Sequence, residues 1–176
     1  MKKPSTSDGS GSAPATVYRE LAPAVLGYLR TQQVPDAEDV LGQVFLHVAR
    51  DLKHFSGDDT ARRRWVFSIA HNRAVDAHRK AARDRSTLEL ELADVGVAWA
   101  AAEPADPFDP ALMAALATLT PAQREVIVLR FVADLSLESV AKITSRRVGA
   151  VKALQHRGLE ILRSAVSPQA HRTLTS

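Results

Sequence analysis

The fold of this chain is decided by the stretch Leu135-Ser-Leu-Glu-Ser-Val-Ala-Lys-Ile-Thr-Ser-Arg-Arg-Val-Gly-Ala-Val-Lys-Ala-Leu-Gln-His-Arg-Gly-Leu-Glu-Ile-Leu162. It predicts two short helices around a tight turn, the second beginning near Val148. At about 100° of rotation per residue, one side of that second helix is apolar. The apolar side comprises Val148, Val151, Leu154, Gly158, Leu159, Ile161 and Leu162. This pattern predicts a helix-turn-helix, a motif that places its second helix in the major groove of DNA.

The opposite side of the second helix alternates small residues with long hydrogen-bond donors. It carries Gly149, Lys152, Ala153, His156, Glu160 and Arg163, with Arg157 on the flank. The small residues let the backbone approach the base pairs, and the long side chains can reach base edges. The segment therefore predicts sequence-specific DNA binding. The alternative is an ordinary amphipathic helix with a solvated charged face.

Composition bounds the class of protein. The chain has 176 residues, of which 45% are hydrophobic and 24% charged, so it can bury one domain core or two small ones. It has no cysteine, which excludes a disulfide framework, a thiolate metal site and a thiol nucleophile. No apolar run approaches the length of a membrane span. Residues 1–15 have no hydrophobic stretch after their two lysines, which predicts a disordered tail and not a signal peptide. We expect a soluble cytoplasmic protein.

Charge is unevenly distributed along the chain, although the net charge is only +3. Lys and Arg dominate the segment 62–85, where the only acids are Asp76 and Asp84. Residues 86–110 are acidic and contain neither Lys nor Arg. A basic segment followed by an acidic one indicates a surface that binds a polyanion, next to a linker that avoids or mimics that polyanion.

The remaining periodicity is helical, and no strand pattern competes with it. Apolar residues recur at helical spacing over 17–31, over 36–55 and in a segment 61–83 that becomes basic toward its end. Asp36 is expected to cap the second of these helices. Residues 87–110 contain three prolines and predict a linker. Thr120-Pro-Ala-Gln123 predicts a capping-box helix start within 111–165, and 166–176 is expected to be a tail.

Two separated motifs resemble one family. Asp36–Phe45 together with Trp65–Arg79 resembles region two of the extracytoplasmic-function (ECF) sigma factors, and Leu119–Phe131 with the helix-turn-helix resembles their region four. The resemblance implies an all-α chain with two small helical domains, a region-two bundle at 16–86 and a region-four helix-turn-helix at 111–165, joined by a flexible acidic linker. It also implies a dissociable subunit of RNA polymerase that directs promoter recognition and DNA melting.

The resemblance implies that the 36–45 helix docks on the clamp of the largest polymerase subunit, while the second domain meets the flap of the second subunit. The candidate polymerase contacts are Asp36, Glu38, Asp39, Gln43 and Phe45. The alternative assigns the acids to the helix start and Phe45 to the core. Gly42 and Gln43 stand where the family often has glutamine and an acid, and a glycine inside a helix costs about 1 kcal/mol relative to alanine.

The basic segment corresponds to the part of the family that meets the minus-ten promoter element. Its candidate residues are Asn72, Arg73, Arg79, Lys80 and Arg83. Lys and Arg offer a path for phosphates, and the Asn72 amide can pair with a base edge. Asp76 is interpreted as a structural partner of a neighbouring arginine, and Trp65 as either a core or a base-stacking residue. The family places its base-selecting loop at Ser56–Thr60. A solvated basic helix is the alternative reading of the segment.

For the minus-thirty-five element, the resemblance and the helical rotation select nearly the same side chains. The candidates are Arg146, Arg147, Lys152, Ala153, His156 and Arg157. Ser145 stands where the family commonly has glycine, and Arg147 stands where a capping Ser or Thr is usual. Because losing such a cap costs about 1 kcal/mol, we expect Arg147 to contact phosphate instead.

Other functional classes fit the sequence less well. The pairs His47/His54 and His71/His78 are each two helical turns apart, too far to share one zinc ion, so we expect no metal site, no cofactor, no catalytic residue and no enzyme. An autonomous helix-turn-helix regulator is the alternative, but it would not need the motif at 36–79. The family implies core polymerase and promoter DNA as partners, with an anti-sigma factor as a further candidate and no membrane.

Overall fold

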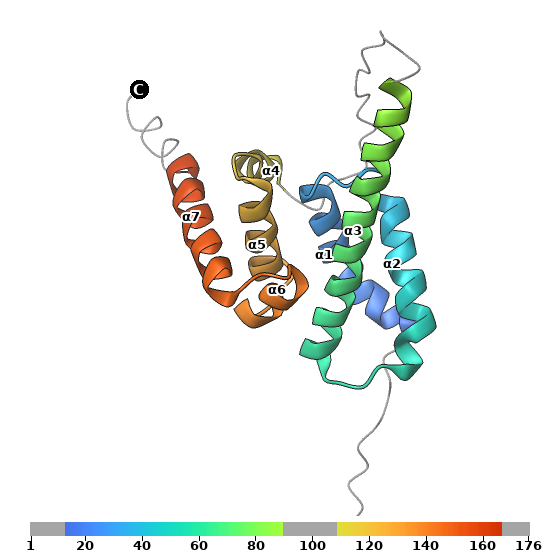
Figure 1. The fold of residues 1–176 in the computed structure, drawn as a ribbon. Coiled ribbons are helices and arrows are strands. Elements are labelled where there is room, and N and C mark those ends of the chain that lie inside the picture. Colours follow the sequence, from blue (N-terminus) through green and yellow to red (C-terminus); the bar gives the residue numbers. More distant parts are fainter. Residues whose placement is uncertain (1–12, 90–108, 167–176) are drawn as a thin grey trace, which may run out of the picture.

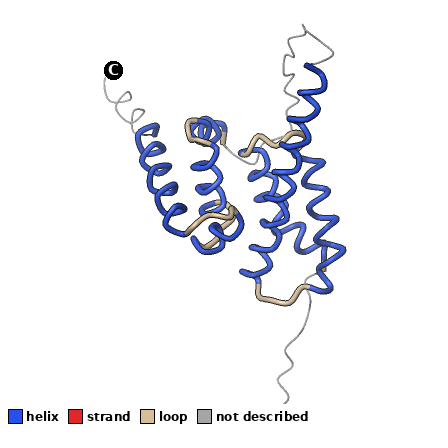
Figure 2. Tube along the Cα trace, viewed as in Figure 1, coloured by secondary structure: helices blue, strands red, loops and turns tan. Residues whose placement is uncertain are grey.

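The structure is a computed structural model that describes residues 13–89 and 109–166 (Figure 1). The described residues form helices and loops without a strand, as expected (Figure 2). The elements are α1 (Pro14–Thr31), α2 (Ala37–Asp51), the 3₁₀ turn η1 (Leu52–His54), α3 (Asp59–Glu89), α4 (Pro110–Ala117), α5 (Pro121–Phe131), α6 (Leu137–Ile143) and α7 (Val148–Val166). Residues 1–12 and 167–176 of the predicted tails and residues 90–108 of the predicted linker lie outside the described residues. Pro14, Ala15 and Val166 were expected in the tails but belong to the ends of α1 and α7.

Helices α1, α2 and α3 pack against one another and form the first unit. Its core is the apolar stripe that the sequence periodicity predicts, with Val25, Val44, Val48 and Phe67 almost completely buried. Asp36 precedes α2 as expected, but its side chain makes no capping hydrogen bond and its backbone is left-handed, with φ of 50°. The expected capping role of Asp36 is therefore wrong, because the tight turn out of α1 sets its backbone conformation instead.

The loop between η1 and α3 is shaped by a close approach at Gly57. A Cβ added there would lie 2.9 Å from the Ala61 Cβ and 3.1 Å from the Phe55 ring. The Asp58 carboxylate accepts a hydrogen bond from the Ala61 backbone N–H at 2.7 Å, so it caps the start of α3. Phe55 stacks on Trp65 with ring centroids 5.0 Å apart. Trp65 thus anchors this loop from the first turns of α3.

Helices α4 to α7 form the second unit. The predicted capping box is confirmed: the Thr120 hydroxyl accepts from the Gln123 backbone N–H, and the Gln123 side chain accepts from the Thr120 N–H. The predicted helix-turn-helix is also confirmed, with α6, a tight turn and α7 beginning at Val148. Ser145 in this turn has a left-handed backbone, with φ of 54°. That conformation explains why glycine suits the position.

The two units pack directly on each other. Helix α1 contacts α4 and α5, and α3 contacts α6. The buried apolar residues of both units form one continuous cluster. Figure 1 shows α7 on the outer side of the second unit, with α5 and α6 between it and the first unit. The sequence predicted two helical units, but it did not predict that they would share a core.

Candidate nucleic-acid and polymerase interfaces

The outward side of α7 displays the side chains expected to read DNA. Lys152, His156 and Arg157 are exposed, Ala153 is half-buried, and Val151 and Gly158 on the opposite side are buried. Arg146 and Arg147 are exposed in the preceding turn. All six predicted residues are therefore available in the turn and the first three turns of α7. The arrangement can present cations to phosphates and long donors to base edges.

The orientation of α7 depends on Arg130 at the end of α5. Its guanidinium donates to the Gln155 side chain of α7 at 3.1 Å and to the Leu135 carbonyl before α6. One side chain therefore links the end of α5 to α7 and to the segment that precedes α6. Sequence analysis did not select Arg130, although an arginine at the end of a buried helix is a recognisable signal because it can reach exposed carbonyls.

Two acidic side chains lie close to the exposed cations of α7. The His156 Nδ1 lies 3.4 Å from a Glu160 carboxylate oxygen one turn later. The pKa of Glu138 is lowered, first by a backbone hydrogen bond at the start of α6, then by the Ser136 hydroxyl and, more weakly, by the charge of Lys152. Glu138 therefore stays ionised in the first helix of the motif. These acids lower the positive potential around Lys152 and His156.

The basic helix α3 presents its predicted residues on adjacent stripes. Asn72, Arg79, Lys80 and Arg83 are exposed, and Arg73 is half-buried. Asn72 and Arg79 lie two turns apart and share one stripe, because residues seven apart return to the same side of a helix. Asn72 therefore offers an amide and Arg79 a cation on the same side of α3. Such an arrangement suits contact with a nucleic-acid strand.

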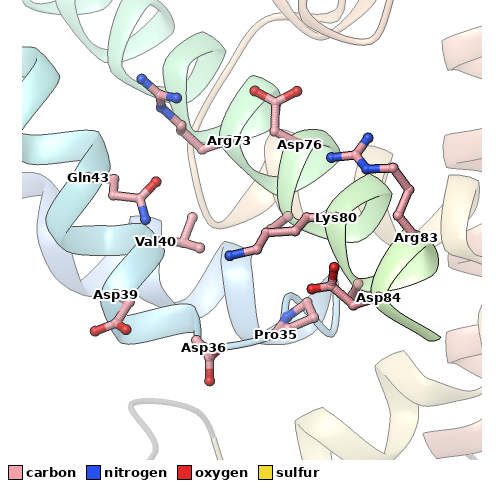
Figure 3. A pocket seen from close by; sticks show the side chains of 12 residues that line it. Pro35, Asp36, Asp39, Val40, Gln43, Arg73, Asp76, Lys80, Arg83 and Asp84 are labelled. Carbon is pink, nitrogen blue, oxygen red and sulfur yellow. The ribbon is translucent and has the colours of Figure 1, made fainter. Parts of the chain in front are cut away.

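A groove between α2 and α3 brings the two predicted sets of region-two residues together (Figure 3). It encloses about 410 Å³. Its polar lining comes from both helices. Asp36 just before α2 and Asp39 and Gln43 within it form one side, and Arg73, Asp76, Lys80, Arg83 and Asp84 of α3 form the other. Carboxylates of one helix thus face cations of the next. Three of the five expected polymerase contacts and three of the five expected minus-ten contacts therefore line one groove.

The outward face of α2 differs in part from the expectation. Asp39 and Gln43 are exposed, but the Glu38 carboxylate is paired with Arg30 of α1 at 2.6 Å. Phe45 is only 8% exposed and makes an edge-to-face contact with Tyr18, so its ring serves the core.

The large apolar residue that this helix exposes is instead Leu46, with 73% of its surface accessible. Sequence analysis missed it. Its spacing of three residues from Gln43 and seven from Asp39 places it on their stripe and could have revealed it.

Among the described residues, no group of three or more His, Asp or Glu side chains lies close enough together to hold a metal ion. None of the described helices is both long enough and apolar enough to cross a membrane.

Comparison with known proteins identifies both units. Residues 17–84 match the family model for sigma-70 region 2, and residues 115–164 match the model for sigma-70 region 4. The chain is 32% identical over 170 residues to the ECF RNA polymerase sigma factor SigD of Mycobacterium bovis, covering 90% of this chain and 79% of SigD. It is 30% identical over 151 residues to the ECF sigma factor BldN of Streptomyces coelicolor, covering 84% of this chain and 54% of BldN.

Two solved structures share the fold. The sigma factor RpoE of Bartonella quintana, in complex with the anti-sigma factor NepR, superposes with a TM-score of 0.65 at 20% identity, over 84% of this chain and 92% of RpoE. CnrH, in complex with the cytosolic domain of CnrY, superposes with a TM-score of 0.57 at 23% identity, over 89% of this chain and 88% of CnrH. The matched region models, the SigD relationship and the helix-turn-helix geometry lead to one conclusion: the chain belongs to the ECF sigma factors, alternative subunits of RNA polymerase that direct promoter recognition.

Proposed function

We propose that three helices of this sigma factor have separate roles. Helix α2 binds core polymerase, α3 opens the minus-ten element and α7 reads the minus-thirty-five element. The observation that carries the proposal is the outward face of α7, where exposed Lys152, His156 and Arg157 lie opposite the buried Val151 and Gly158. A helix held by its apolar side and presenting donors on the other suits the major groove.

For the minus-thirty-five element, Lys152, Ala153, His156 and Arg157 face the bases. Arg146 and Arg147 contact the phosphates beside the turn. Each phosphate contact that is lost should weaken binding across sequences and reduce the salt dependence by about one counterion. A lost base contact should cost about 1–3 kcal/mol at one position of the element.

For the minus-ten element, the exposed stripe of α3 carries the separated strand. Asn72 pairs with a base edge, and Arg73, Arg79, Lys80 and Arg83 line the path of the phosphates. The loop anchored by Phe55 and Trp65 stands beside the first turns of α3, where an unstacked base would be received.

For core polymerase, the stripe of Asp39, Gln43 and Leu46 on α2 offers a polar surface with one exposed apolar side chain. This composition fits a protein interface, where an apolar anchor is surrounded by polar contacts. Asp36 contributes from the end of the groove. Glu38 pairs with Arg30 and Phe45 packs against Tyr18, so both side chains hold α2 against α1. The second unit meets the flap of the second largest subunit.

The chain itself performs no chemical step in this proposal, because the polymerase catalyses transcription. We place the protein in the cytoplasm with core polymerase, and we propose that an anti-sigma protein holds it until a signal arrives. The domain limits that we assign are 16–86 for region two and 111–165 for region four, with the acidic linker between them.

The experiment is in-vitro transcription with purified core polymerase on a library of genomic promoter fragments, with start sites mapped with and without the protein. We expect discrete starts that share two upstream elements and that are lost in Lys152→Ala/Arg157→Ala and in Asn72→Ala. Arg19→Ala is the matched control, because Arg19 is an exposed arginine of α1 outside all three surfaces. Specific duplex binding without any protein-dependent start would instead establish an autonomous regulator.

A further inference from the structure

His156 differs from the other candidate base-reading residues of α7, because its ring can either accept or donate a hydrogen bond. Lys152 and Arg157 can only donate, and the methyl group of Ala153 does neither. The His156 side chain is 75% exposed on the outward face of the helix. An imidazole in this place can recognise two different groups on a base edge, depending on which of its nitrogens carry protons.

A carboxylate one turn later favours one position for the ring proton. The His156 Nδ1 lies 3.4 Å from a Glu160 carboxylate oxygen. An ionised carboxylate can only accept hydrogen bonds, so it favours a proton on Nδ1 in both charge states of the ring. The Nε2 atom then remains to contact a ligand. Glu160 thus sets the role of the ring nitrogen that it does not touch.

Charged residues of α7 act on His156 in opposite directions. Lys152 lies one turn before it and Arg157 directly follows it, and both cations disfavour a second proton on the ring. Glu160 lies one turn after it and favours that proton. Removal of the Glu160 carboxylate should therefore make the ring harder to protonate.

The helices packed against α7 add few charges near His156. Helix α5 contributes Arg130, which donates to Gln155 beside the histidine, and α6 contributes Glu138, which interacts electrostatically with Lys152. Helix α4 has no charged side chain. The other charged residues of α5 and α6 are placed elsewhere: Arg124 is buried, Glu125 contacts Tyr28 of the first unit, and Lys142 lines a cavity against α3.

The two charge states of His156 match different bases in the major groove. With a single proton on Nδ1, the ring offers Nε2 as an acceptor, and cytosine presents a donor there, its N4 amino group. With two protons, the ring donates from Nε2, and guanine presents the acceptors O6 and N7. Histidine is the side chain whose charge ordinarily changes between pH 5 and 8. The base that suits His156 therefore depends on pH.

We propose that His156 is a specificity-determining residue of the minus-thirty-five interface whose preferred base depends on the charge of its ring, and that Glu160 is the positioning residue that sets this preference. The neutral ring selects cytosine at alkaline pH, and the charged ring selects guanine in acid. This inference rests on the proposed role of α7 in reading the minus-thirty-five element.

Transcription of competing promoters by core polymerase and the full chain tests the proposal. A promoter of this sigma factor is randomised over its minus-thirty-five element and transcribed with the natural protein and with His156→Ala. The position whose base preference is lost in the variant is the one that His156 contacts. Two templates, with cytosine or guanine at that position, are then transcribed together in one reaction from about pH 5 to about pH 8. General effects of pH on the polymerase cancel in the ratio of the two products.

The ratio of the cytosine product to the guanine product should rise about tenfold over this range, the scale of one base contact. In Glu160→Ala the rise should be centred at lower pH, because the carboxylate that favours the charged ring is gone. The preference for cytosine at alkaline pH should also weaken, since the remaining proton is no longer held on Nδ1. A merely structural role of Glu160 would lower both products equally and would not change the ratio.

Two substitutions serve as controls. His156→Gln cannot gain a charge, so its ratio should stay constant with pH. His47 of α2 is spaced from Asp51 as His156 is from Glu160, with 3.1 Å between its Nε2 and a carboxylate oxygen. His47→Gln removes this second histidine–carboxylate pair from a helix outside the second unit, and should leave the ratio and its pH dependence as in the natural protein.

The outcomes separate this inference from the proposed function. A ratio that is constant with pH in the natural protein, or that follows the same curve in Glu160→Ala, would overturn the inference even if both templates are transcribed normally. Loss of the pH dependence in His47→Gln, or no altered position in His156→Ala, would overturn it as well. Base preferences that are unchanged at every position in Lys152→Ala/Arg157→Ala would instead overturn the proposed role of α7.

Discussion

Gly158 of α7 lies directly against Ile127 of α5, so that a Cβ added to the glycine would stand 3.1 Å from the Ile127 Cγ1. The contact sets how closely the DNA-reading helix approaches the core of the second unit. Ile127 is 5% exposed and has little room to move. The glycine is therefore a packing requirement of the helix-turn-helix, within a helix that would otherwise favour alanine.

Gly158→Val should destabilise the protein by about 1–3 kcal/mol, because the added methyl groups overpack the contact between α5 and α7. Urea unfolding followed by circular dichroism measures the change. Gly149→Val on the exposed side of the same helix is the control, since a Cβ there meets nothing within 4 Å. Equal stability of the two variants would contradict the packing role.

Gly42→Ala should raise the free energy of unfolding by about 1 kcal/mol, the usual difference between the two residues inside a helix. Gly42 is exposed in the middle of α2, and a Cβ there meets nothing within 4 Å. Ala49→Gly, a reverse change at another exposed position of α2, should lower the stability by a similar amount. A destabilised Gly42→Ala variant would show that the glycine serves the fold.

Ser145→Gly should stabilise the protein by about 1 kcal/mol, because Ser145 has a φ of 54° and a side chain disfavours that left-handed backbone. Ser145→Val should do the opposite, since a β-branched side chain is least tolerated there. Thermal unfolding of the two variants beside the natural protein measures both shifts. The strain assignment fails if glycine and valine change the midpoint in the same direction.

The ion pair between Glu38 and Arg30 should make part of the stability depend on pH. The hydrogen bond from Arg30 is the main reason that the pKa of Glu38 is lowered. A lowered pKa adds stability that is present above the ordinary pKa of a glutamate and is lost as the pH falls through the lowered value.

Glu38→Gln should therefore be less stable than the natural protein at neutral pH, and the difference should disappear in acid. We expect less than about 1 kcal/mol, because the Glu38 side chain is 55% exposed and water screens the pair. Urea unfolding at neutral and acidic pH, with and without high salt, measures it. A difference that persists in acid and in salt would assign the effect to packing instead of charge.

Short-range sequence patterns were sufficient to predict many features of this protein. The helix start at Thr120 and the outward side of α7 involve residues within a few positions of one another, and the geometry of a helix relates such residues directly. The same geometry selected Val44 and Val48 as core, and both are buried. Rotation places Leu46 on the stripe of Asp39 and Gln43, away from Val44 and Val48. Phe45 lies at the edge of the apolar stripe, and only the packing of α1 shows that its ring is covered.

The sequence by itself determined the all-α class, the two helical units and the side of α7 that faces outward, because each follows from short-range periodicity and capping. Only the tertiary structure decided what lies far apart in the chain but close in space. Tyr28 and Glu125 are 97 residues apart, and no periodic pattern relates them. The groove where Asp39 faces Lys80 and the packing of α6 over α3 likewise depend on how whole helices dock, which is set by the burial of the shared core.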